Sequence, residues 1–344
     1  MKNSPSYIEI RTGSDSDIPR IKAAYELLEH LGIPYTPRIL SAHRTPGVMA
    51  DEARRLPDNG FRVCIAAAGG SAHLPGMTAS ETLLPVVGIP VRTSVIGGID
   101  SVLSIIQMPE GIPVGTTGVG QSEHAALLAA QIAYLGESEI RNKIRSFCGI
   151  KSKLSGQIVL NPVIGIVKTN ATEFDPITYQ KMISFLQKAG IEVVEYDTVN
   201  QTKDEALHYL AELERKGAVA NIVIYSVYHR IDGELSPGFW SSRTDIPNIV
   251  LPVVTDADLA VDEITRIMLH DRLILEEFKI MPNWGAVAFM GINRYQNAAL
   301  YGAQIAGVFF PSISRTIKNY RSELASVVRE KDERLITDGI IQFL

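Results

Sequence analysis

Residues 7–33 read YIEIRTGSDSDIPRIKAAYELLEHLGI, which is the pattern of a strand, a turn and a helix in succession. The apolar run at 7–11 predicts a strand, and the apolar spacing over 18–31 predicts a helix that ends at Gly32. The alternation continues with strands expected at 38–40, 62–67, 86–89 and 113–116 and helices at 45–55, 77–82 and 122–135. Such alternation indicates βαβ units and a parallel sheet with helices on both faces.

The pattern occurs twice in the chain. Residues 8–33 align with 166–191 at an offset of 158, and residues 107–133 align without a gap with 280–306 at an offset of 173. Both matches occur in the same order, which predicts two tandem copies of one domain. The larger second offset indicates an insertion in the second copy, expected between Arg230 and Asp262.

The boundary between the copies is expected in a polar segment near residues 150–160. The predicted domains are a catalytic one at 1–150 and a second copy at 158–344. Charged helical segments at 137–147 and 314–334 follow the two copies. They could cap their own domain or pack on a neighbour, and the sequence leaves both readings open.

Composition limits the class of protein. A length of 344 residues suggests two domains, and a net charge of −5 with a pI near 5.9 offers no broad attraction for nucleic acid or anionic lipid. The two isolated cysteines form neither a disulfide framework nor a metal site, which favours a reducing compartment. We see no signal peptide and no apolar run long enough to span a bilayer. The expected location is the cytoplasm, with no nucleic-acid or membrane partner.

Three polar turns follow three successive predicted strands. The first, residues 13–17 (GSDSD), has the glycine, hydroxyl and carboxylate groups of an anion cradle at a helix start, although a plain helix N-cap looks the same. The second, residues 41–46 (SAHRTP), carries an arginine suited to a phosphate and a histidine that can move a proton. As alternatives, Arg44 is a surface ion-pair partner and His43 a solvated loop residue.

The third turn, residues 67–77 (AAGGSAHLPGM), has paired glycines that allow a backbone to approach a ligand closely. Its alternative reading is a glycine-rich connection with an incidental histidine, His73. Ligands bind beyond the carboxyl ends of parallel strands, so the three turns should converge on one pocket. The sequence shows no GxxxxGK[ST] loop, no GxSxG elbow and no HExxH metal motif. The pocket suits proton transfer on a small phosphorylated ligand without a redox cofactor.

These residues resemble a known family. GSDSD, SAHRTP and AGGSAHLPGM, followed by PVVGIPV, DSVLSIIQMPEGIPVGT and AALLAAQI, are similar to the N5-carboxyaminoimidazole ribonucleotide mutases of purine biosynthesis. The resemblance covers residues 7–135 almost without gaps. It implies a flavodoxin-like three-layer α/β/α domain with a parallel sheet, normally assembled as an octamer, with no metal and no organic cofactor. The related carboxylases typically carry SAHK and a GRSN-type loop, which are absent here.

The resemblance also implies roles for individual residues. It assigns the proton carrier to His43 and ribonucleotide binding to Ser14, Asp17 and Arg44. It places four further residues around the base and carboxylate: Ser41, Gly69, His73 and Leu74. One departure is His124, because the family usually has Asn-Ala-Ala-Leu where this chain has His-Ala-Ala-Leu. That departure puts subunit packing or pocket closure in doubt at this position.

The second copy lacks the chemistry of the first. Residues 199–203 align with SAHRT, so His43 and Arg44 have no counterparts, whereas Asp175 and Asn297 are retained. His229 beside Arg230 suggests a second site, but a structural copy that lost its acid–base groups explains the pattern better. If family sites lie near subunit contacts, one chain replaces two subunits, and four chains form a pseudo-octamer.

The leading interpretation is an active mutase (an isomerase) with its chemistry in residues 1–150. The nearest alternative is direct carboxylation of aminoimidazole ribonucleotide with carbon dioxide, a lyase activity. From a different class, the chain could be a non-catalytic nucleotide-binding or assembly protein, which the intact SAHRTP and AHLPGM motifs argue against. A flavodoxin-like electron carrier is disfavoured because no aromatic-flanked flavin loop is visible.

Overall fold

The computed structural model describes residues 5–93, 97–169, 174–227, 235–254 and 285–338. His229 and Arg230 lie outside these ranges, as do residues 230–234 and 255–262 of the region where the insertion is predicted. Below, the first half means residues 1–150 and the second half residues 158–344. In the part of the chain that the structure describes, no helix has both the length and the apolar character needed to cross a bilayer.

The described strands of the first half are β1 (Ile8–Thr12), β2 (Tyr35–Ile39), β3 (Val63–Ala68), β4 (Val86–Pro90) and β5 (Gly115–Thr116). Its helices are the 3₁₀ helix η1 (Asp15–Ile21), α1 (Lys22–Leu31), α2 (Pro46–Arg54), α3 (His73–Glu81), α4 (Ile99–Ile106), α5 (Ser122–Ala133) and α6 (Ser138–Phe147).

The described strands of the second half are β6 (Val163–Thr169), β7 (Glu192–Asp197), β8 (Ala220–Ser226), β9 (Asn248–Val253) and β10 (Val287–Phe289). Its helices are α7 (Pro176–Lys188), α8 (Lys203–Lys216), α9 (Pro237–Arg243), α11 (Tyr295–Phe309) and α12 (Pro311–Asp338).

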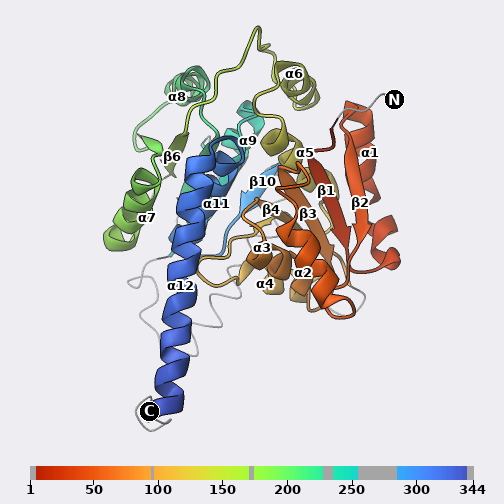
Figure 1. Cartoon of the computed structure of the whole chain (residues 1–344). Coiled ribbons are helices and arrows are strands. Elements are labelled where there is room, and N and C mark those ends of the chain that lie inside the picture. The colour runs from red at the N-terminus through yellow and green to blue at the C-terminus, as the bar shows by residue number, and fades with distance from the viewer. Residues whose placement is uncertain (1–4, 94–96, 170–173, 228–234, 255–284, 339–344) are drawn as a thin grey trace.

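All ten of these strands form one sheet in the order β2-β1-β3-β4-β5-β10-β9-β8-β6-β7 (Figure 1). Within each half every pairing is parallel, and only β5 and β10 pair antiparallel. Each half therefore has the strand order 2-1-3-4-5, which is the flavodoxin-like doubly wound order. The predicted α/β fold is confirmed, and the shared order supports two copies of one domain.

The burial of the strands differs between the middle and the edges of the sheet. Every residue of β1, β3 and β4 is buried, as expected for parallel strands covered on both faces, whereas β2 and β7 at the edges alternate between covered and exposed residues. Helix α1 ends as predicted, with Gly32 in the left-handed conformation at φ +68°. Helix α8 begins with a capping box between Thr202 and Glu205.

Two helices differ from the sequence expectations. The helix expected at 77–82 begins earlier, at His73, because Pro75 lies in its first turn, where proline is tolerated. Helix α4 was not expected at all. Its sequence IDSVLSII is nearly all apolar, and periodicity alone does not separate such a run from a buried strand.

The junction of the two halves has local two-fold symmetry. The antiparallel pairing joins Thr116 of β5 to Phe289 of β10. These are equivalent residues of the two copies, because the offset of 173 places Thr116 on Phe289. A symmetric two-fold contact sets equivalent residues opposite one another, so the halves meet as two subunits of a symmetric dimer would.

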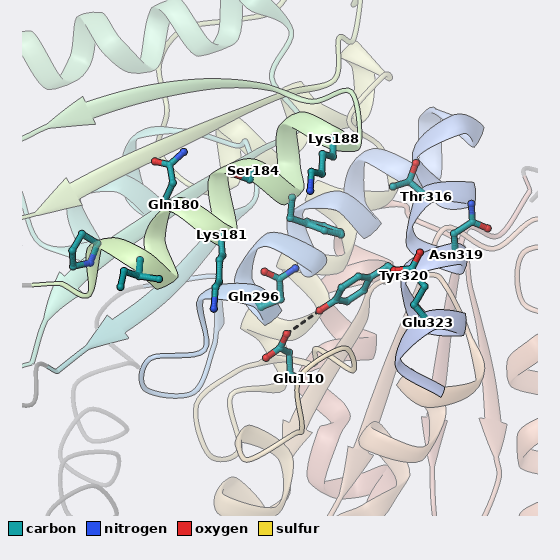
Figure 2. A pocket seen from close by; sticks show the side chains of 13 residues that line it. Glu110, Gln180, Lys181, Ser184, Lys188, Gln296, Thr316, Asn319, Tyr320 and Glu323 are labelled. Carbon is teal, nitrogen blue, oxygen red and sulfur yellow. Dashed lines mark hydrogen bonds between the residues drawn. The ribbon is translucent and has the colours of Figure 1, made fainter. Parts of the chain in front are cut away.

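The last helix of the second half, α12, contacts the first half. The Tyr320 hydroxyl donates to Glu110 Oε1 at 2.9 Å, and both residues line a cleft of about 1060 Å³ beside α7 and α12 (Figure 2). Arg321 Nη1 donates to the carbonyl oxygens of Ala79 at 3.0 Å and Thr82 at 2.6 Å, at the C-terminal end of α3. Helix α12 thus packs on the other half as well as its own.

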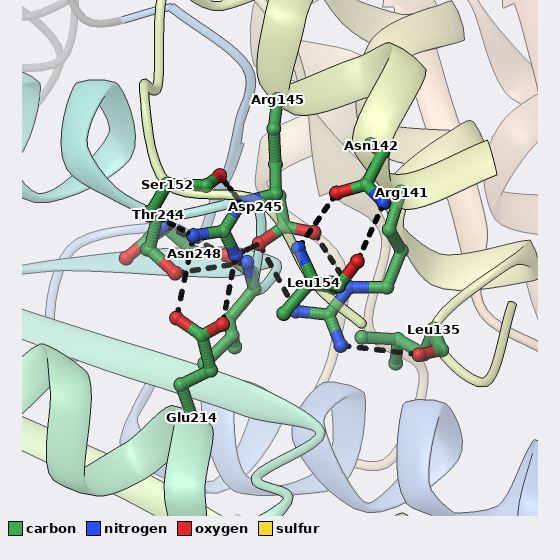
Figure 3. A network of polar contacts seen from close by, with 11 residues as sticks. Leu135, Arg141, Asn142, Arg145, Ser152, Leu154, Glu214, Thr244, Asp245 and Asn248 are labelled. Carbon is green, nitrogen blue, oxygen red and sulfur yellow. Dashed lines mark hydrogen bonds and ion pairs between the residues drawn. The ribbon is translucent and has the colours of Figure 1, made fainter. Parts of the chain in front are cut away.

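The last helix of the first half, α6, makes the reciprocal contact (Figure 3). Arg141 Nη2 and Arg145 Nη1 donate to Asp245 Oδ1 at 3.0 and 2.9 Å, and Asp245 lies just before β9 in the second half. All three side chains are at most 4% exposed. Each half therefore ends in a helix that packs on its own half and on the other half, so both readings that the sequence left open apply.

Candidate active site

The three predicted turns lie at one edge of the sheet. They follow β1, β2 and β3, which are adjacent in the order β2-β1-β3 and run parallel. The carboxyl ends of these strands therefore meet, as the sequence predicted.

The first turn is a capped helix start. Ser14 is the N-cap of η1, and its Oγ accepts from the Ser16 amide at 3.3 Å. Asp17 lies half-buried in the first turn of η1, where burial raises the pKa of its carboxyl above 3.8 and Arg20, 3.9 Å away, opposes the shift. The plain N-cap reading is therefore correct for Ser14, because the Ser16 amide donates to Ser14 Oγ and Asp15 Oδ1, and the Asp17 amide donates to the Ser14 carbonyl oxygen.

Arg44 joins the second turn to the first. Its Nη2 donates to the Gly13 carbonyl oxygen at 2.8 Å, and its backbone amide donates to Ser41 Oγ at 3.1 Å. Ser41 is in turn fixed by Thr45, whose Oγ1 accepts from the Ser41 amide at 3.1 Å. Gly13 and Ser41 are uncharged acceptors, so these contacts orient the guanidinium without neutralising it. Arg44 is exposed, and its positive charge lies beside the start of η1.

His43 and His73 join the second turn to the third. His43 Nε2 and His73 Nδ1 lie 2.8 Å apart, with the two rings almost perpendicular at 84°. Which nitrogen donates depends on the tautomer. In a hydrogen bond between two imidazoles, one ring nitrogen donates its proton to the other. Both side chains are exposed to solvent. The pair can exchange a proton with a ligand bound beside it.

The third turn reaches α3 through unusual backbone geometry. Gly70 has φ +65°, and the buried Ala72 has φ +35°, a left-handed conformation that is uncommon outside glycine. Gly69 does not have a positive φ, so its backbone does not require a glycine. Leu74 as a whole is 2% exposed, and its side chain packs in the core. The structure thus places Leu74 at the site but does not turn its side chain toward a ligand.

Two residues beside the third turn, Thr93 and Asp100, are not among those predicted from the sequence. Thr93 Oγ1 donates to Asp100 Oδ1 at 3.3 Å, and a Cβ at Gly70 would lie 3.9 Å from Asp100 Oδ2. Asp100 is in the first turn of α4, the helix that was not expected. A glycine pair before an acidic residue, Gly97-Gly98-Ile99-Asp100, was the available signal of a helix start.

His124 lies in the first turn of α5. Burial lowers the pKa of its imidazole below the ordinary 6.5, and the Glu123 carboxylate opposes the shift. At the equivalent position in the second half stands Asn297, the residue type that the family usually has here.

The half-buried His124 is expected to make the stability of the fold sensitive to acid. The folded state binds a proton at His124 less readily than the unfolded state does, so stability falls as the pH drops below 6.5 toward the lower folded pKa. His124→Asn removes this contribution. Denaturant unfolding at about pH 7.5 and about pH 5.5 should show a smaller loss of stability in the variant than in the wild type. An equal loss in both proteins would exclude His124 as a source of acid sensitivity.

The second half has no matching site among its described residues. The loop between β7 and α8 places Gln201 where the first half has His43. Asp175, the counterpart of Asp17, is exposed and caps α7 by accepting from the Ile177 amide at 3.0 Å. Hydrogen bonds from Thr178 and the Ile177 amide lower the pKa of this carboxyl. Asp175 therefore has a structural role.

Known proteins match the first half. The AIR carboxylase family matches residues 7–153. The chain is 46% identical over 147 residues to a protein of Pyrococcus horikoshii named N5-carboxyaminoimidazole ribonucleotide mutase, which covers 43% of this chain and 83% of the relative. A Thermotoga maritima protein of the same name is 49% identical over 140 residues, which covers 41% of this chain and 82% of the relative.

Two further similarities involve a plant enzyme and a solved structure. A chloroplastic phosphoribosylaminoimidazole carboxylase of Vigna aconitifolia is 48% identical over 135 residues, 39% of this chain and 24% of the relative. The crystal structure of Treponema denticola PurE is 28% identical, covers 41% of this chain and 89% of that one, and has a TM-score of 0.39. Because the chain spans more than four fifths of two mutases at well over 40% identity, it belongs to the AIR carboxylase family.

Proposed function

We propose that this chain is an N5-carboxyaminoimidazole ribonucleotide mutase of purine biosynthesis, with its active site in the first half. The observation that carries the proposal is the His43–His73 hydrogen bond of 2.8 Å beside Arg44, at the edge of the sheet in the half that matches the mutases. This arrangement combines a proton carrier with a phosphate-binding cation.

The ribonucleotide phosphate is expected to bind between Arg44 and the start of η1. The Arg44 guanidinium is held beside the Gly13 carbonyl oxygen, and Ser14 is the N-cap of η1. A helix N-terminus and a guanidinium both favour a phosphate dianion. Asp17, Ser41, Gly69 and Leu74 would then lie around the ribose, base and carboxylate. This orientation places the aminoimidazole next to His43 and His73.

The reaction then needs only proton transfer and a carbon dioxide molecule that stays in the pocket. Cationic His43 gives a proton to the exocyclic nitrogen as the bond from that nitrogen to the carboxylate carbon breaks and carbon dioxide leaves. Ring carbon 4 attacks the carbon dioxide, and the proton on this carbon returns to neutral His43. Nothing is oxidised or reduced, and the balance needs no cofactor. Holding carbon dioxide in the pocket supplies effective molarity.

Direct carboxylation of aminoimidazole ribonucleotide is a second candidate, favoured by the 48% identity to a plant protein named as a carboxylase. Purified protein supplied separately with the N-carboxylated ribonucleotide, and with the unmodified amine plus bicarbonate, separates the two. We expect formation of the 4-carboxylated product from the first substrate. Turnover only with the amine plus bicarbonate would refute the mutase proposal, and no turnover with either would support a non-catalytic nucleotide-binding protein.

We further propose that the second half is a structural copy and that the chain forms a homo-oligomer. The two-fold pairing of Thr116 with Phe289 supports one chain standing for a dimer of subunits. Four chains would form the pseudo-octamer, with four times the 37.6 kDa of one chain. A solution mass of 37.6 kDa by light scattering would refute this assembly. Both cysteines, Cys64 and Cys148, are free, which supports the cytoplasmic location proposed for such an enzyme.

A further inference from the structure

We propose that Asn297 and Arg321, both in the second half, are positioning residues for the His43–His73 pair in the first half. The inference rests on the proposed role of this pair in proton transfer. It gives the second half a part in the chemistry although the described residues there include no acid–base site of their own.

Both the oxygen and the nitrogen of the Asn297 side-chain amide form hydrogen bonds with a loop of the first half. Its Oδ1 accepts from the Gly111 amide at 3.0 Å, and its Nδ2 donates to the carbonyl oxygens of Met108 at 3.3 Å and Pro109 at 3.1 Å. Asn297 is 4% exposed at the start of α11. A buried amide with all these partners fixes the path of the loop at residues 108–111.

Helix α12 holds the same loop from another direction. Arg321 Nε donates to the Gly111 carbonyl oxygen at 3.1 Å, and Tyr320 binds the Glu110 carboxylate (Figure 2). Side chains of the second half therefore contact every one of the residues 108–111.

The loop in turn packs on α3, the helix that begins at His73. A Cβ at Gly76 would lie only 2.6 Å from Met108 Sδ, so the Met108 side chain rests directly against Gly76. Gly76 is in the first turn of α3, close to His73. A shift of the loop at 108–111 would therefore displace the first turn of α3, which carries His73, or remove its packing contact with Met108.

Arg321 fixes the opposite end of α3. Its Nη1 donates to the carbonyl oxygens of Ala79 and Thr82, where the last turn of α3 leaves its carbonyl groups unpaired within the helix. Burial lowers the Arg321 pKa to about 10, so the side chain stays cationic at neutral pH and also favours the negative end of the helix dipole. Helix α3 is thus held at both ends by the second half, directly by Arg321 and through Met108 by Asn297.

The test uses the full-length protein and two variants, Asn297→Ala and Arg321→Met. Proton transfer depends steeply on alignment, so we expect each variant to lower kcat by about 10- to 100-fold while KM changes by less than about 3-fold. Asn319→Ala and Arg315→Met on the exposed surface of α12 are the matched controls and should retain kcat. A kcat within about 2-fold of wild type in folded Asn297→Ala and Arg321→Met proteins would overturn the inference.

A double-mutant cycle separates positioning from general damage. If Asn297 acts through His73, the double variant Asn297→Ala/His73→Ala should be no slower than His73→Ala alone, because the alignment is already lost. Multiplication of the two single effects would contradict the inference. Should Asn297→Ala fail to fold, Asn297→Asp keeps the acceptor for the Gly111 amide and loses the donors to Met108 and Pro109, and the same cycle applies.

Hydrogen exchange distinguishes failure of this inference from failure of the proposed function. Amides in residues 73–81 should exchange faster in Asn297→Ala and Arg321→Met than in wild type and the two controls, without any substrate present. Unchanged exchange at 73–81 would overturn the positioning role even if the wild type is a mutase. Faster exchange together with a wild type inactive on both ribonucleotides would refute the proposed function and support the coupling.

Discussion

Replacing His43 with Asn is expected to abolish turnover while leaving ligand binding nearly intact. Asparagine keeps a polar side chain in the turn after β2 but can neither give up nor take up a proton near neutral pH, and the 2.8 Å contact between the two imidazoles is lost. Loss of general acid–base catalysis typically costs about 10²- to 10⁴-fold in rate. Steady-state kinetics with the N-carboxylated ribonucleotide measures kcat, and calorimetric titration with the product measures affinity.

Gln201→Ala is the matched control, because Gln201 occupies the position equivalent to His43 in the second half. We expect it to retain activity within about 2-fold. If His43→Asn retained full activity, the assignment of the proton carrier would be wrong. If Gln201→Ala were the inactive variant, the chemistry would lie in the second half.

Replacing Asp245 with Asn is expected to destabilise the fold strongly. Asp245 is 1% exposed and receives hydrogen bonds from Arg141 and Arg145, while Glu214 provides a second partner for Arg145 only (Figure 3). Asparagine keeps the shape but leaves the buried guanidinium groups without their shared counter-charge. Removing one partner of a buried ion pair costs about 3–5 kcal/mol in the free energy of unfolding. Urea unfolding followed by circular dichroism measures the change.

Asp51→Asn removes an exposed ion pair and is the control for the buried ion pairs of Asp245. Asp51 pairs with Arg54 at 3.0 Å on the surface, with both side chains more than half exposed. The change in its unfolding free energy should stay within about 0.5 kcal/mol. Equal stability of the Asp51 and Asp245 variants would show that the contact of α6 with the second half contributes little.

The sequence predicted the first half closely because its signals are local. The turn at Gly13–Asp17 and the strands beside it follow from residue type and periodicity. Parallel strands bring their carboxyl ends to one edge, so the contacts of Arg44 with Gly13 and of His43 with His73 follow from the strand order. Whether these residues act as proposed remains a prediction, which the His43 variant tests.

The contacts between the halves could not be predicted from the same signals. Arg141 and Arg145 belong to a charged helical segment whose packing partner the sequence leaves open, and both are buried because they bind Asp245 of the other half. Asn297 is recognisable as the residue type usual in the family, but its partners lie almost 190 positions earlier in the chain. Helix periodicity defines a buried face and not the surface that covers it.

The most direct test of the account is the number of ligand molecules that one chain binds. The first half has Arg44, His43 and His73 together, and the described residues of the second half have no equivalent set. Isothermal titration of the full-length protein with 4-carboxyaminoimidazole ribonucleotide should give one site per chain, and Arg44→Met should weaken that site strongly. Two equal sites per chain, or one site that Arg44→Met leaves unchanged, would contradict the claim that a single working site lies in the first half.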